Sequence, residues 1–386
     1  MRRTTTILRV PDVLVFADSI RSPELRHEVP IAVPDPFLYG EREGARHVLV
    51  HSMEAARMGG LGLELHTPEE YGQDELIAQR MERYAIQREL ALRACRAWGI
   101  ERATVPAGFP LELADYLREG GLEVTADRRF FAERRRRKNK AELAGIRRAQ
   151  HAAETGMAAA RDLLRRAQPN GAGLVADGEP VTSERVKSLL EQAFNEQGCS
   201  ADEMVVSHGA QTAIGHHMGE GAILPGEPIV IDVWPRDRKS GCHADMTRTF
   251  VVGTPPDDIR EWHRLCVQAL EQAVAGTKAG VQDADLNSAT IDLFDAHGQP
   301  TLRTKEPGKP LENGFLHSLG HGVGLEVHEA PTLGLVAADE LVAGEVITVE
   351  PGLYRRGYGG VRVEDLLLVT DEGAENLTQF PYDLEP

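Results

Sequence analysis

Three histidines fall within twelve residues of the sequence, in the segment HSLGHGVGLEVHEAP at positions 317–331. Imidazole side chains are common metal ligands, so three histidines this close together indicate a candidate functional site. His317 and His321 are four residues apart, which on a helix would place both on one face, as in zinc proteases. Each of the three glycines in the segment, however, costs about 1 kcal/mol in a helix relative to alanine. We therefore predict a glycine-rich turn that leads into an extended segment packed closely against other backbone. A surface turn with incidental histidines is the alternative.

Four carboxylates stand in strand-like segments where a buried strand would be apolar. They are Asp232 in IVIDV, Asp245 in ADMTRTFVV, Glu350 in VITVE and Glu364 in VRVED. A single such acid is commonly a strand-end or surface residue, but four buried carboxylates repel one another and lose hydration unless cations compensate them. Two divalent cations would balance four carboxylates. Four oxygen donors with one imidazole suit a pair of Mn, Fe, Co or Zn ions, which can polarise a carbonyl and activate water.

The elements that must position these residues lie between residues 136 and 386. Helical periodicity predicts one helix over 140–166, a second from a cap at Ser183, and two more around 259–269 and 286–293. Strands are predicted at 204–207, 229–233, 244–252, 346–350 and 361–370, with a turn at 236–241. No G-x-G-x-x-G follows a strand. The pattern favours an α+β domain, in which helices lie outside an antiparallel sheet.

Strand periodicity gives three of the carboxylates a polar neighbour, because residues two apart on a strand share a face. By this rule Arg362 lies beside Glu364. The same rule places Thr247 beside Asp245 and Thr348 beside Glu350. These neighbours are predicted to orient the acidic side chains.

Residues 1–135 are predicted to form a smaller α/β unit. Short apolar runs predict strands at 13–16, 47–50, 103–105 and 122–124, and good helix formers predict one long helix over 75–96. Three histidines of this region have ordinary neighbours in the sequence and are expected to be structural or merely exposed: His47, His51 and His66. The basic tract ERRRRKNK at 133–140 is interpreted as a solvated linker or helix start between the domains.

Composition limits the binding partners and the cellular location that we expect for the protein. The chain has 386 residues, a net charge of -17 and a pI near 5.3, which disfavours nucleic acid or an anionic membrane as partner. The four cysteines are widely spaced, so a reducing, cytoplasmic environment is expected. The N-terminal stretch lacks an apolar signal region, and no run of 18 apolar residues predicts a membrane span.

The motifs IDV…HADMTRTF, HSLGHGVGLEVHEAP, VEPGLY and VRVED together resemble those of the pita-bread metallopeptidases, in the Xaa-Pro aminopeptidase and proline dipeptidase branch. The resemblance covers about residues 140–386. It implies a C-terminal pita-bread catalytic domain, 136–386, preceded by a creatinase-type N-terminal α/β domain, 1–135. The second assignment depends on arrangement more than on motif.

The resemblance also implies a role for each site residue. Two divalent metal ions, Mn first and Co, Fe or Zn as options, would be held by five ligands: Asp232, Asp245, His321, Glu350 and Glu364. Asp245 and Glu364 would bridge the metals, and Glu350 would also transfer a proton. The catalytic set would be His216, His317, His328, Glu350 and Arg362. Which of His216 and His217 is the active-site histidine stays open.

The implied function is hydrolysis of the Xaa-Pro bond at peptide N-termini by a homodimeric cytoplasmic hydrolase. Proline dipeptidases often carry an arginine four residues after the His328 equivalent, where this chain has Thr332, which favours an aminopeptidase. Arg355 or Arg356 are possible replacements. A proline dipeptidase, or a family member that hydrolyses a small non-peptide amide, is the alternative. Creatinase-like and non-catalytic members lack some of the five ligands, and a methionine aminopeptidase needs no domain of this length before the ligands.

Overall fold

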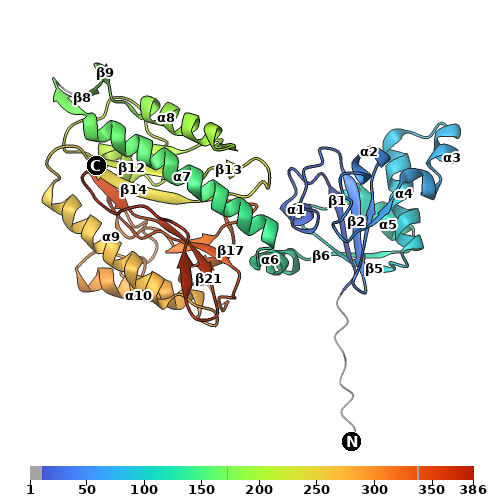
Figure 1. Ribbon diagram of the computed structural model, residues 1–386. Coiled ribbons are helices and arrows are strands. Elements are labelled where there is room, and N and C mark those ends of the chain that lie inside the picture. Colours follow the sequence, from blue (N-terminus) through green and yellow to red (C-terminus); the bar gives the residue numbers. More distant parts are fainter. Residues whose placement is uncertain (1–10, 172, 337–338) are drawn as a thin grey trace, which may run out of the picture. The chain divides into compact units, whose positions relative to one another are not determined.

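The computed structural model describes residues 11–171, 173–336 and 339–386, and the chain divides into two compact units, 1–135 and 136–386 (Figure 1). The first ten residues, on which the expectation of no signal region partly depends, lie outside the described residues. Each unit has two hydrophobic cores of its own among the described residues.

The first unit is built on a six-stranded mixed sheet in the order β4-β3-β2-β1-β5-β6. Its strands are β1 (Val13–Ala17), β2 (Phe37–Arg42), β3 (Ala45–Leu49), β4 (Glu64–His66), β5 (Arg102–Val105) and β6 (Glu123–Ala126). Strands β3 and β4 are parallel, as are β1 with β5 and β5 with β6, whereas β2 is antiparallel to both of its neighbours. Apolar residues of the central strand β1, such as Leu14, are fully buried.

The helices of this unit are α1 (Pro23–Glu28), α2 (Ser52–Ala55), the 3-10 helix η1 (Pro68–Tyr71), α3 (Gln73–Ala78), α4 (Arg83–Ala97), α5 (Leu111–Glu119) and α6 (Arg128–Arg136). The prediction of one continuous helix over 75–96 is wrong. Arg80 has a left-handed backbone with φ of 56°, and Glu82 then caps α4 by accepting hydrogen bonds from the N–H groups of Tyr84 and Ala85. A good N-cap outcompetes helix continuation at this point.

The basic tract at 133–140 contains a helix start, as predicted, because Asn139 caps a helix that begins at Lys140. The alternative prediction of a solvated linker is wrong. Arg136 and Lys138 are only 5% and 8% exposed. The first forms an ion pair with Glu345, and the second with Glu329. The sequence indicated the charges but could not indicate their acidic partners, which lie about 200 residues away.

The second unit contains four long helices around its sheets, α7 (Lys140–Arg166), α8 (Ser183–Glu196), α9 (Asp257–Gly276) and α10 (Asp283–Ala296). Helices α7 and α8 pack on one core and α9 and α10 on another, with the strands between the two pairs (Figure 1). All four were predicted. The cap of α8 is Thr182 rather than Ser183, because the Thr182 hydroxyl accepts the hydrogen bond from the N–H of Arg185.

Two sheets carry most of the strands near the predicted site, in the orders β11-β12-β14 and β17-β16-β18-β21-β22. Their strands are β11 (Val205–His208), β12 (Pro228–Val233), β14 (Met246–Val251), β16 (Gly320–Gly322), β17 (Glu329–Leu333), β18 (Val346–Val349), β21 (Asp365–Val369) and β22 (Ala374–Asn376). A third sheet, β15-β19-β20, contains β15 (Asn313–Gly314), β19 (Gly352–Arg355) and β20 (Gly359–Arg362). The predicted single strand 361–370 is therefore two strands, β20 and β21, in different sheets.

Smaller elements complete the second unit. They are the sheet of β7 (Gln168–Asn170), β8 (Gly173–Ala176) and β9 (Glu179–Pro180), the pair β10 (Cys199–Ser200) and β13 (Arg236–Asp237), and the 3-10 helix η2 (Gly209–Ala213). Strand β13 lies in the turn predicted at 236–241, between the antiparallel strands β12 and β14.

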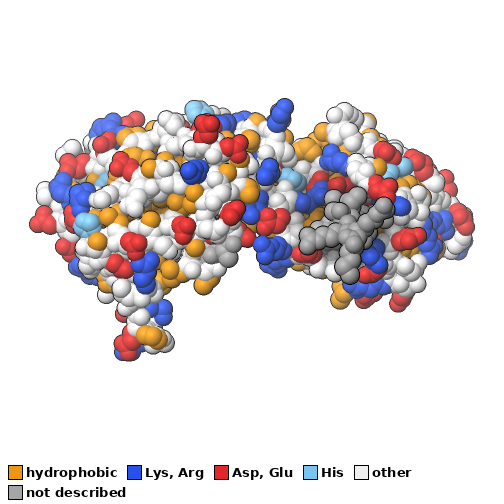
Figure 2. Space-filling view, turned by 90° about the horizontal axis from the view of Figure 1, so that it is seen from below, with side chains coloured by type: hydrophobic (Ala, Val, Ile, Leu, Met, Phe, Trp, Pro, Cys, Tyr) orange, Lys and Arg blue, Asp and Glu red, His pale blue; other side chains and the backbone are white. Residues whose placement is uncertain are grey.

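The surface carries charges of both signs, and the cysteines lie in the interior. Acidic and basic side chains are interspersed over the face shown in Figure 2. All four cysteines are buried and free of disulfides. Among the described residues no helix has the length and hydropathy needed to cross a bilayer.

Candidate metal centre

The first two carboxylates are brought together by an antiparallel strand pair. Strand β12 pairs with β14 so that Asp232 lies opposite Thr247, and Asp245 precedes β14 by one residue. Asp245 is only 4% exposed. The hairpin therefore places two acids from positions 13 residues apart at one end of the β11-β12-β14 sheet.

The glycine-rich segment is extended and closely packed, as predicted, rather than helical. A Cβ on Gly320 would lie 2.1 Å from the Thr348 carbonyl oxygen, and one on Gly322 would lie 2.2 Å from the Ala330 oxygen. Only glycine allows β16 to approach β18 and β17 this closely. The histidine between the two glycines, His321, is thereby fixed on a short strand that lies between β17 and β18 in the sheet.

His321 presents one nitrogen to the carboxylates. Its Nδ1 donates to the carbonyl oxygen of Gly322 at 3.1 Å, which leaves a lone pair on Nε2. Nε2 lies 3.4 Å from Glu350 Oε1 and 3.8 Å from Asp245 Oδ2. Burial lowers the pKa of His321 to about 4, which favours the neutral ring that metal coordination requires.

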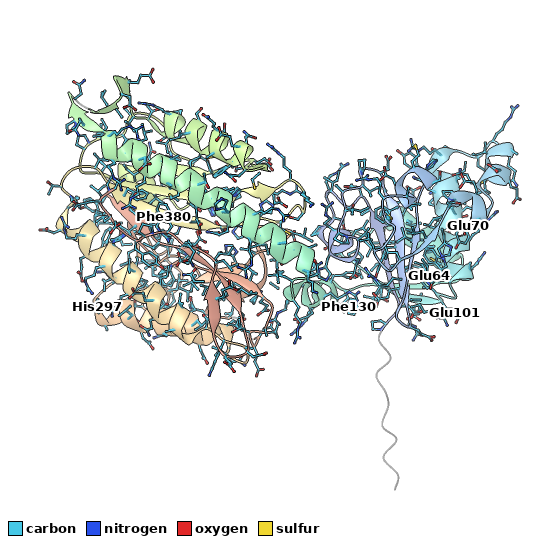
Figure 3. All side chains as sticks on the ribbon, viewed as in Figure 1. Glu64, Glu70, Glu101, Phe130, His297 and Phe380 are labelled. Atoms are coloured by element: carbon cyan, nitrogen blue, oxygen red, sulfur yellow. The ribbon has the colours of Figure 1, made fainter. Side chains whose placement is uncertain are left out.

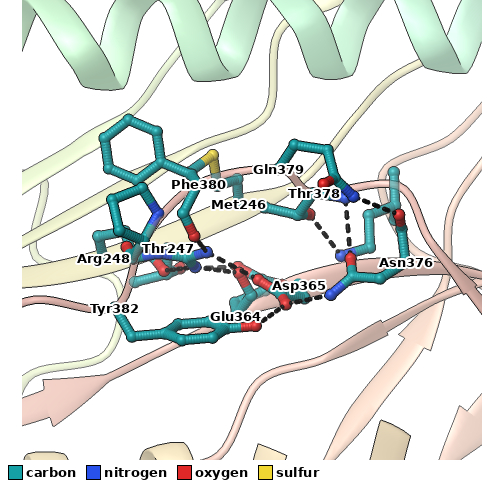
Figure 4. A network of polar contacts seen from close by, with 12 residues as sticks. Met246, Thr247, Arg248, Glu364, Asp365, Asn376, Thr378, Gln379, Phe380 and Tyr382 are labelled. Carbon is teal, nitrogen blue, oxygen red and sulfur yellow. Dashed lines mark hydrogen bonds and ion pairs between the residues drawn. The ribbon is translucent and has the colours of Figure 1, made fainter.

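Glu364 lies where the chain leaves β20 and enters β21. Its Oε2 accepts a hydrogen bond of 2.7 Å from the Thr247 hydroxyl. Its backbone oxygen accepts 2.7 Å from Arg248, whose guanidinium also pairs with the buried Asp365 at 2.9 Å. The surrounding side chains of Asn376 and Tyr382 donate to Asp365 (Figure 4). This buried network sets the position of Glu364.

Three of the five predicted ligands form one tight group. Ligand atoms of Asp245, His321 and Glu364 lie within 4.8 Å of one another. Glu350 is adjacent through its 3.4 Å contact with His321, and Asp232 lines the same cavity. The structure thus brings all five side chains to one place.

The electrostatics of this group fit divalent cations. Burial, followed by repulsion from neighbouring carboxylates, raises the pKa of Asp245 and of Glu364 well above the ordinary range. Burial raises the pKa of Glu350 to about 8. Asp232 Oδ1 is buried without a hydrogen-bond partner. Carboxylates that are desolvated, mutually repelling and incompletely hydrogen-bonded are the donor set that cations stabilise.

Arg362 contacts a different carboxylate from the one predicted. Its guanidinium pairs with Asp232 Oδ2 and donates to the Thr247 hydroxyl at 3.3 Å, not to Glu364. The rule that residues two apart share a face does not hold here, because the strand is interrupted between β20 and β21. Thr247 contacts Glu364 rather than Asp245, because Thr247 and Glu364 form an antiparallel bridge and Asp245 lies outside β14. The third predicted neighbour, Thr348, accepts from the backbone N–H of His321 at 3.1 Å.

Tyr354, on β19, was not recognised in the sequence. Its hydroxyl accepts from Arg362 Nη1 at 3.1 Å and lies 2.9 Å from His317 Nε2. His317 Nδ1 donates to the Ser318 carbonyl oxygen at 2.8 Å, so Nε2 is the acceptor for the tyrosine proton. His317 is therefore oriented through Tyr354. The sequence signal was its place in VEPGLY, four residues after Glu350.

A cavity of about 930 Å³ opens beside the ligands and is lined by histidines and apolar side chains. His216 and His328 both line it, and the ring of His328 lies 4.3 Å from that of His321. His217 instead accepts a hydrogen bond from the Gly219 N–H at 3.0 Å through Nδ1. Of the two candidates at this position, His216 is therefore the one that faces the cavity.

Comparison with known proteins shows which family and fold the chain resembles. Metallopeptidase family M24 matches residues 144–371. An Xaa-Pro dipeptidase of Pyrococcus furiosus is 34% identical over 185 residues, which are 48% of this chain and 49% of that protein. An uncharacterized peptidase of Bacillus subtilis, YqhT, is 32% identical over 201 residues, or 52% and 53% of the two chains. The alignments thus span about half the length of these curated relatives.

Solved structures share the fold over nearly the whole chain. An Xaa-Pro dipeptidase from Bacillus anthracis superposes with a TM-score of 0.77 and 23% identity, covering 97% of this chain and 94% of the other. An X-Pro aminopeptidase from Thermotoga maritima gives 0.77 and 21%, covering 97% of both. The predicted α+β pita-bread fold with a smaller domain before it is confirmed. The match over residues 144–371 shows that the chain belongs to metallopeptidase family M24.

Proposed function

We propose that the protein is an Xaa-Pro aminopeptidase, a hydrolase that removes the first residue of peptides whose second residue is proline. Two divalent cations, with manganese as the first choice, would be held by Asp232, Asp245, His321, Glu350 and Glu364. The family resemblance makes Asp245 and Glu364 the bridging candidates, and both belong to the tight group with His321. The cations would polarise the scissile carbonyl and activate water.

The protein's own residues supply proton transfer and positioning. Glu350 would accept a proton and pass it to the leaving proline nitrogen. His216 and His328, which line the cavity, would donate hydrogen bonds to the oxyanion. Arg362 would hold Asp232, and His317 would act through Tyr354. Apolar lining residues, among them Trp234, offer a surface for the proline ring.

One observation favours an aminopeptidase over a dipeptidase: among the described residues that line the cavity, none is an arginine or lysine without an acidic partner. Thr332 lines it where proline dipeptidases often have an arginine. Arg355 pairs with Asp258 at 2.8 Å and Arg356 pairs with Glu312, and neither lines the cavity. The one lining arginine, Arg362, is engaged with Asp232. A dipeptide carboxylate would therefore be buried without a charged partner, which costs binding energy.

Hydrolysis of two peptides tests this proposal, a Gly-Pro dipeptide and an Arg-Pro-Pro tripeptide, with manganese-loaded and EDTA-treated protein. We expect metal-dependent release of arginine from the tripeptide and little action on the dipeptide. Preference for the dipeptide would make the protein a proline dipeptidase, the activity named for several relatives. Cleavage of neither by metal-loaded protein would favour a small non-peptide amide as substrate.

The ligand assignment has its own test. Asp245→Ala and Glu364→Ala should each lose both metals and all peptidase activity, because each removes a bridging carboxylate. Asp258→Ala removes an exposed carboxylate that pairs with Arg355 and serves as the control. Full activity in either ligand variant would contradict a dinuclear centre.

We further propose that residues 1–135 form a creatinase-type N-terminal domain and residues 136–386 the catalytic domain, and that the protein is a cytoplasmic homodimer. The division into compact units between Arg135 and Arg136 supports the domain boundary. The four thiols without disulfides are in keeping with a reducing compartment. Light scattering coupled to size exclusion measures the oligomeric state, and a monomeric mass would overturn the dimer.

A further inference from the structure

A second cluster of metal-binding side chains lies in the first unit, apart from the catalytic cavity. His47 is on β3, and Glu64 and His66 are on β4, the edge strand of the sheet. The parallel register places His47 opposite Glu64 and Leu49 opposite His66, so all three side chains share one face. One ligand atom from each of the three residues lies within 4.8 Å of those of the other two. The labelled Glu64 and Glu70 mark this region in Figure 3.

The three side chains present more hydrogen-bond acceptors to one another than donors. His66 Nδ1 lies 3.3 Å from Glu70 Oε2, which as a carboxylate can only accept. In a neutral ring the proton is therefore on Nδ1 and His66 Nε2 has a lone pair. His47 Nδ1 is 3.3 Å from that lone pair and 3.2 Å from Glu64 Oε2. A single N–H on His47 would have to be shared between these two acceptors, whereas one cation would bind all three groups.

The distances match tetrahedral coordination. Bonds of about 2.0–2.1 Å to zinc place neighbouring ligand atoms roughly 3.3 Å apart. The separations of 3.2 and 3.3 Å measured from His47 Nδ1 agree with this spacing. Two imidazoles and one carboxylate form a known zinc ligand set that leaves the fourth position for water. A carboxylate that accepts from the other nitrogen of a ligating histidine, as Glu70 does from His66, is the usual support of such a site.

The surroundings hold the two rings while leaving one side open. The Trp98 indole stacks on His47 with centroids 5.1 Å apart and planes inclined by 12°. Tyr71 contacts the edge of His66 at 5.8 Å and accepts from Trp98 Nε1 at 2.8 Å. The Glu64 side chain is 59% exposed, so a cation can enter from solvent.

We propose that His47, Glu64 and His66 form a mononuclear zinc site in the first unit, with Glu70 as the positioning carboxylate and water in the fourth position. This site is independent of the dinuclear centre. A bound cation would link the edge strand β4 to β3 and, through Glu70, to η1.

Zinc stoichiometry of the full chain tests the site. The parent and a His47→Gln/His66→Gln variant are loaded with Zn²⁺, dialysed and measured by mass spectrometry of the metal. We expect the double variant to hold one zinc per chain less than the parent, whatever the second unit binds. His51→Asn is the matched control, because it removes a nearby histidine outside the cluster while keeping a side-chain acceptor for α2. Equal zinc in parent and double variant would overturn the site.

Two milder variants keep the test decisive if the double variant does not fold. Glu64→Gln changes an exposed ligand, and Glu70→Gln changes the support of His66 while keeping an amide oxygen that can accept from the Thr67 N–H. Each should weaken zinc binding to this site, Glu70→Gln by about 10- to 100-fold. Glu69→Gln, at the adjacent exposed position, should leave affinity unchanged. Unchanged affinity in both Glu64→Gln and Glu70→Gln would contradict the proposal.

Discussion

At the scale of single residues, the candidate centre is organised by a chain of hydrogen bonds that ends on a carboxylate. Arg362 connects Asp232 to Tyr354, and Tyr354 connects Arg362 to His317. Each of these groups is desolvated, and burial lowers the pKa of His317 to about 4. Because a buried network is stable only when every member is paired, one missing hydroxyl affects both of its partners.

Tyr354→Phe is predicted to destabilise the protein and to lower peptidase kcat/KM. The change leaves His317 Nε2 and Arg362 Nη1 without their partner, and an unsatisfied buried polar group costs about 1–3 kcal/mol. Urea unfolding and initial rates on the tripeptide measure the two effects. Tyr358→Phe, at a 38% exposed tyrosine that packs against Trp262, is the control and should change neither. Wild-type stability of Tyr354→Phe would show that the bonds to Tyr354 are weak.

The contrast between Tyr354 and the acids shows what a residue type can reveal. Asp232 or Glu350 in an apolar strand is an anomaly that demands compensation, so the sequence indicated the carboxylates of the candidate centre. A tyrosine in a strand is ordinary core chemistry, so Tyr354 gave no signal. His47 and His66 also gave none, because their convergence depends on the parallel pairing of β3 and β4, which local patterns do not encode.

At the scale of elements, the position of His321 depends on the close approach of short strands. Strand β16 is three residues long, and the glycines on both sides of His321 contact neighbouring backbone. The glycines of this segment allowed the sequence to predict that its backbone packs closely against other backbone. The breaks were not readable: Arg80 divides α3 from α4, and the interruption at Glu364 divides β20 from β21. The first break is made by a left-handed residue followed by the local cap Glu82, and the second depends on tertiary pairing of Glu364 with Thr247.

Gly320→Ala is predicted to impair metal binding and stability together. The new Cβ would lie 2.1 Å from the Thr348 carbonyl oxygen, so β16 must move away from β18 and carry His321 with it. Manganese titration by calorimetry and thermal unfolding measure the outcome. Gly334→Ala is the control, because its nearest neighbours are side-chain carbons at 3.6 Å, an ordinary contact distance. Equal metal affinity in the two variants would contradict this account of His321.

Helix α9 gives a pH prediction through His263. Burial, with a smaller effect of Arg248, lowers the pKa of His263 to about 4 from an ordinary value of 6.5. Between these values the unfolded chain binds the proton and the folded protein does not, so stability is lost as the pH falls from 6.5 towards 4. Unfolding free energies in EDTA at several pH values should fall less steeply for His263→Gln than for the parent. Parallel profiles would exclude His263 as a contributor.

At the scale of the whole molecule, the second unit has two hydrophobic cores. The proposed ligands are carried by strands of two different sheets. Asp232 and Asp245 belong to the β12 and β14 pair, whereas His321 and Glu350 are carried by β16 and the end of β18. Cations bound between them would join the two halves of the unit. Folding and metal binding should therefore be linked.

Manganese is predicted to stabilise the parent against unfolding, by about 2.7 kcal/mol at a free concentration of 100 times the Kd. Asp245→Ala should show no such gain, because it lacks a bridging carboxylate. Differential scanning calorimetry with and without manganese, after EDTA treatment, measures both. A gain of equal size in the Asp245→Ala variant would place the stabilising metal elsewhere in the chain.

The buried cysteines have a consequence for following how the protein opens. Cys95 lies in a core of the first unit, Cys199 and Cys242 in the core beneath α7 and α8, and Cys266 in the core beneath α9 and α10. Burial raises the thiol pKa of Cys95 to about 12, of Cys199 to about 11 and of Cys242 to about 12, and raises that of Cys266 as well. The folded thiols are therefore protonated and inert towards alkylation. Each of these three cores thus contains at least one thiol that reacts only when the core opens. The order in which maleimide labels the four thiols therefore reports which core opens first.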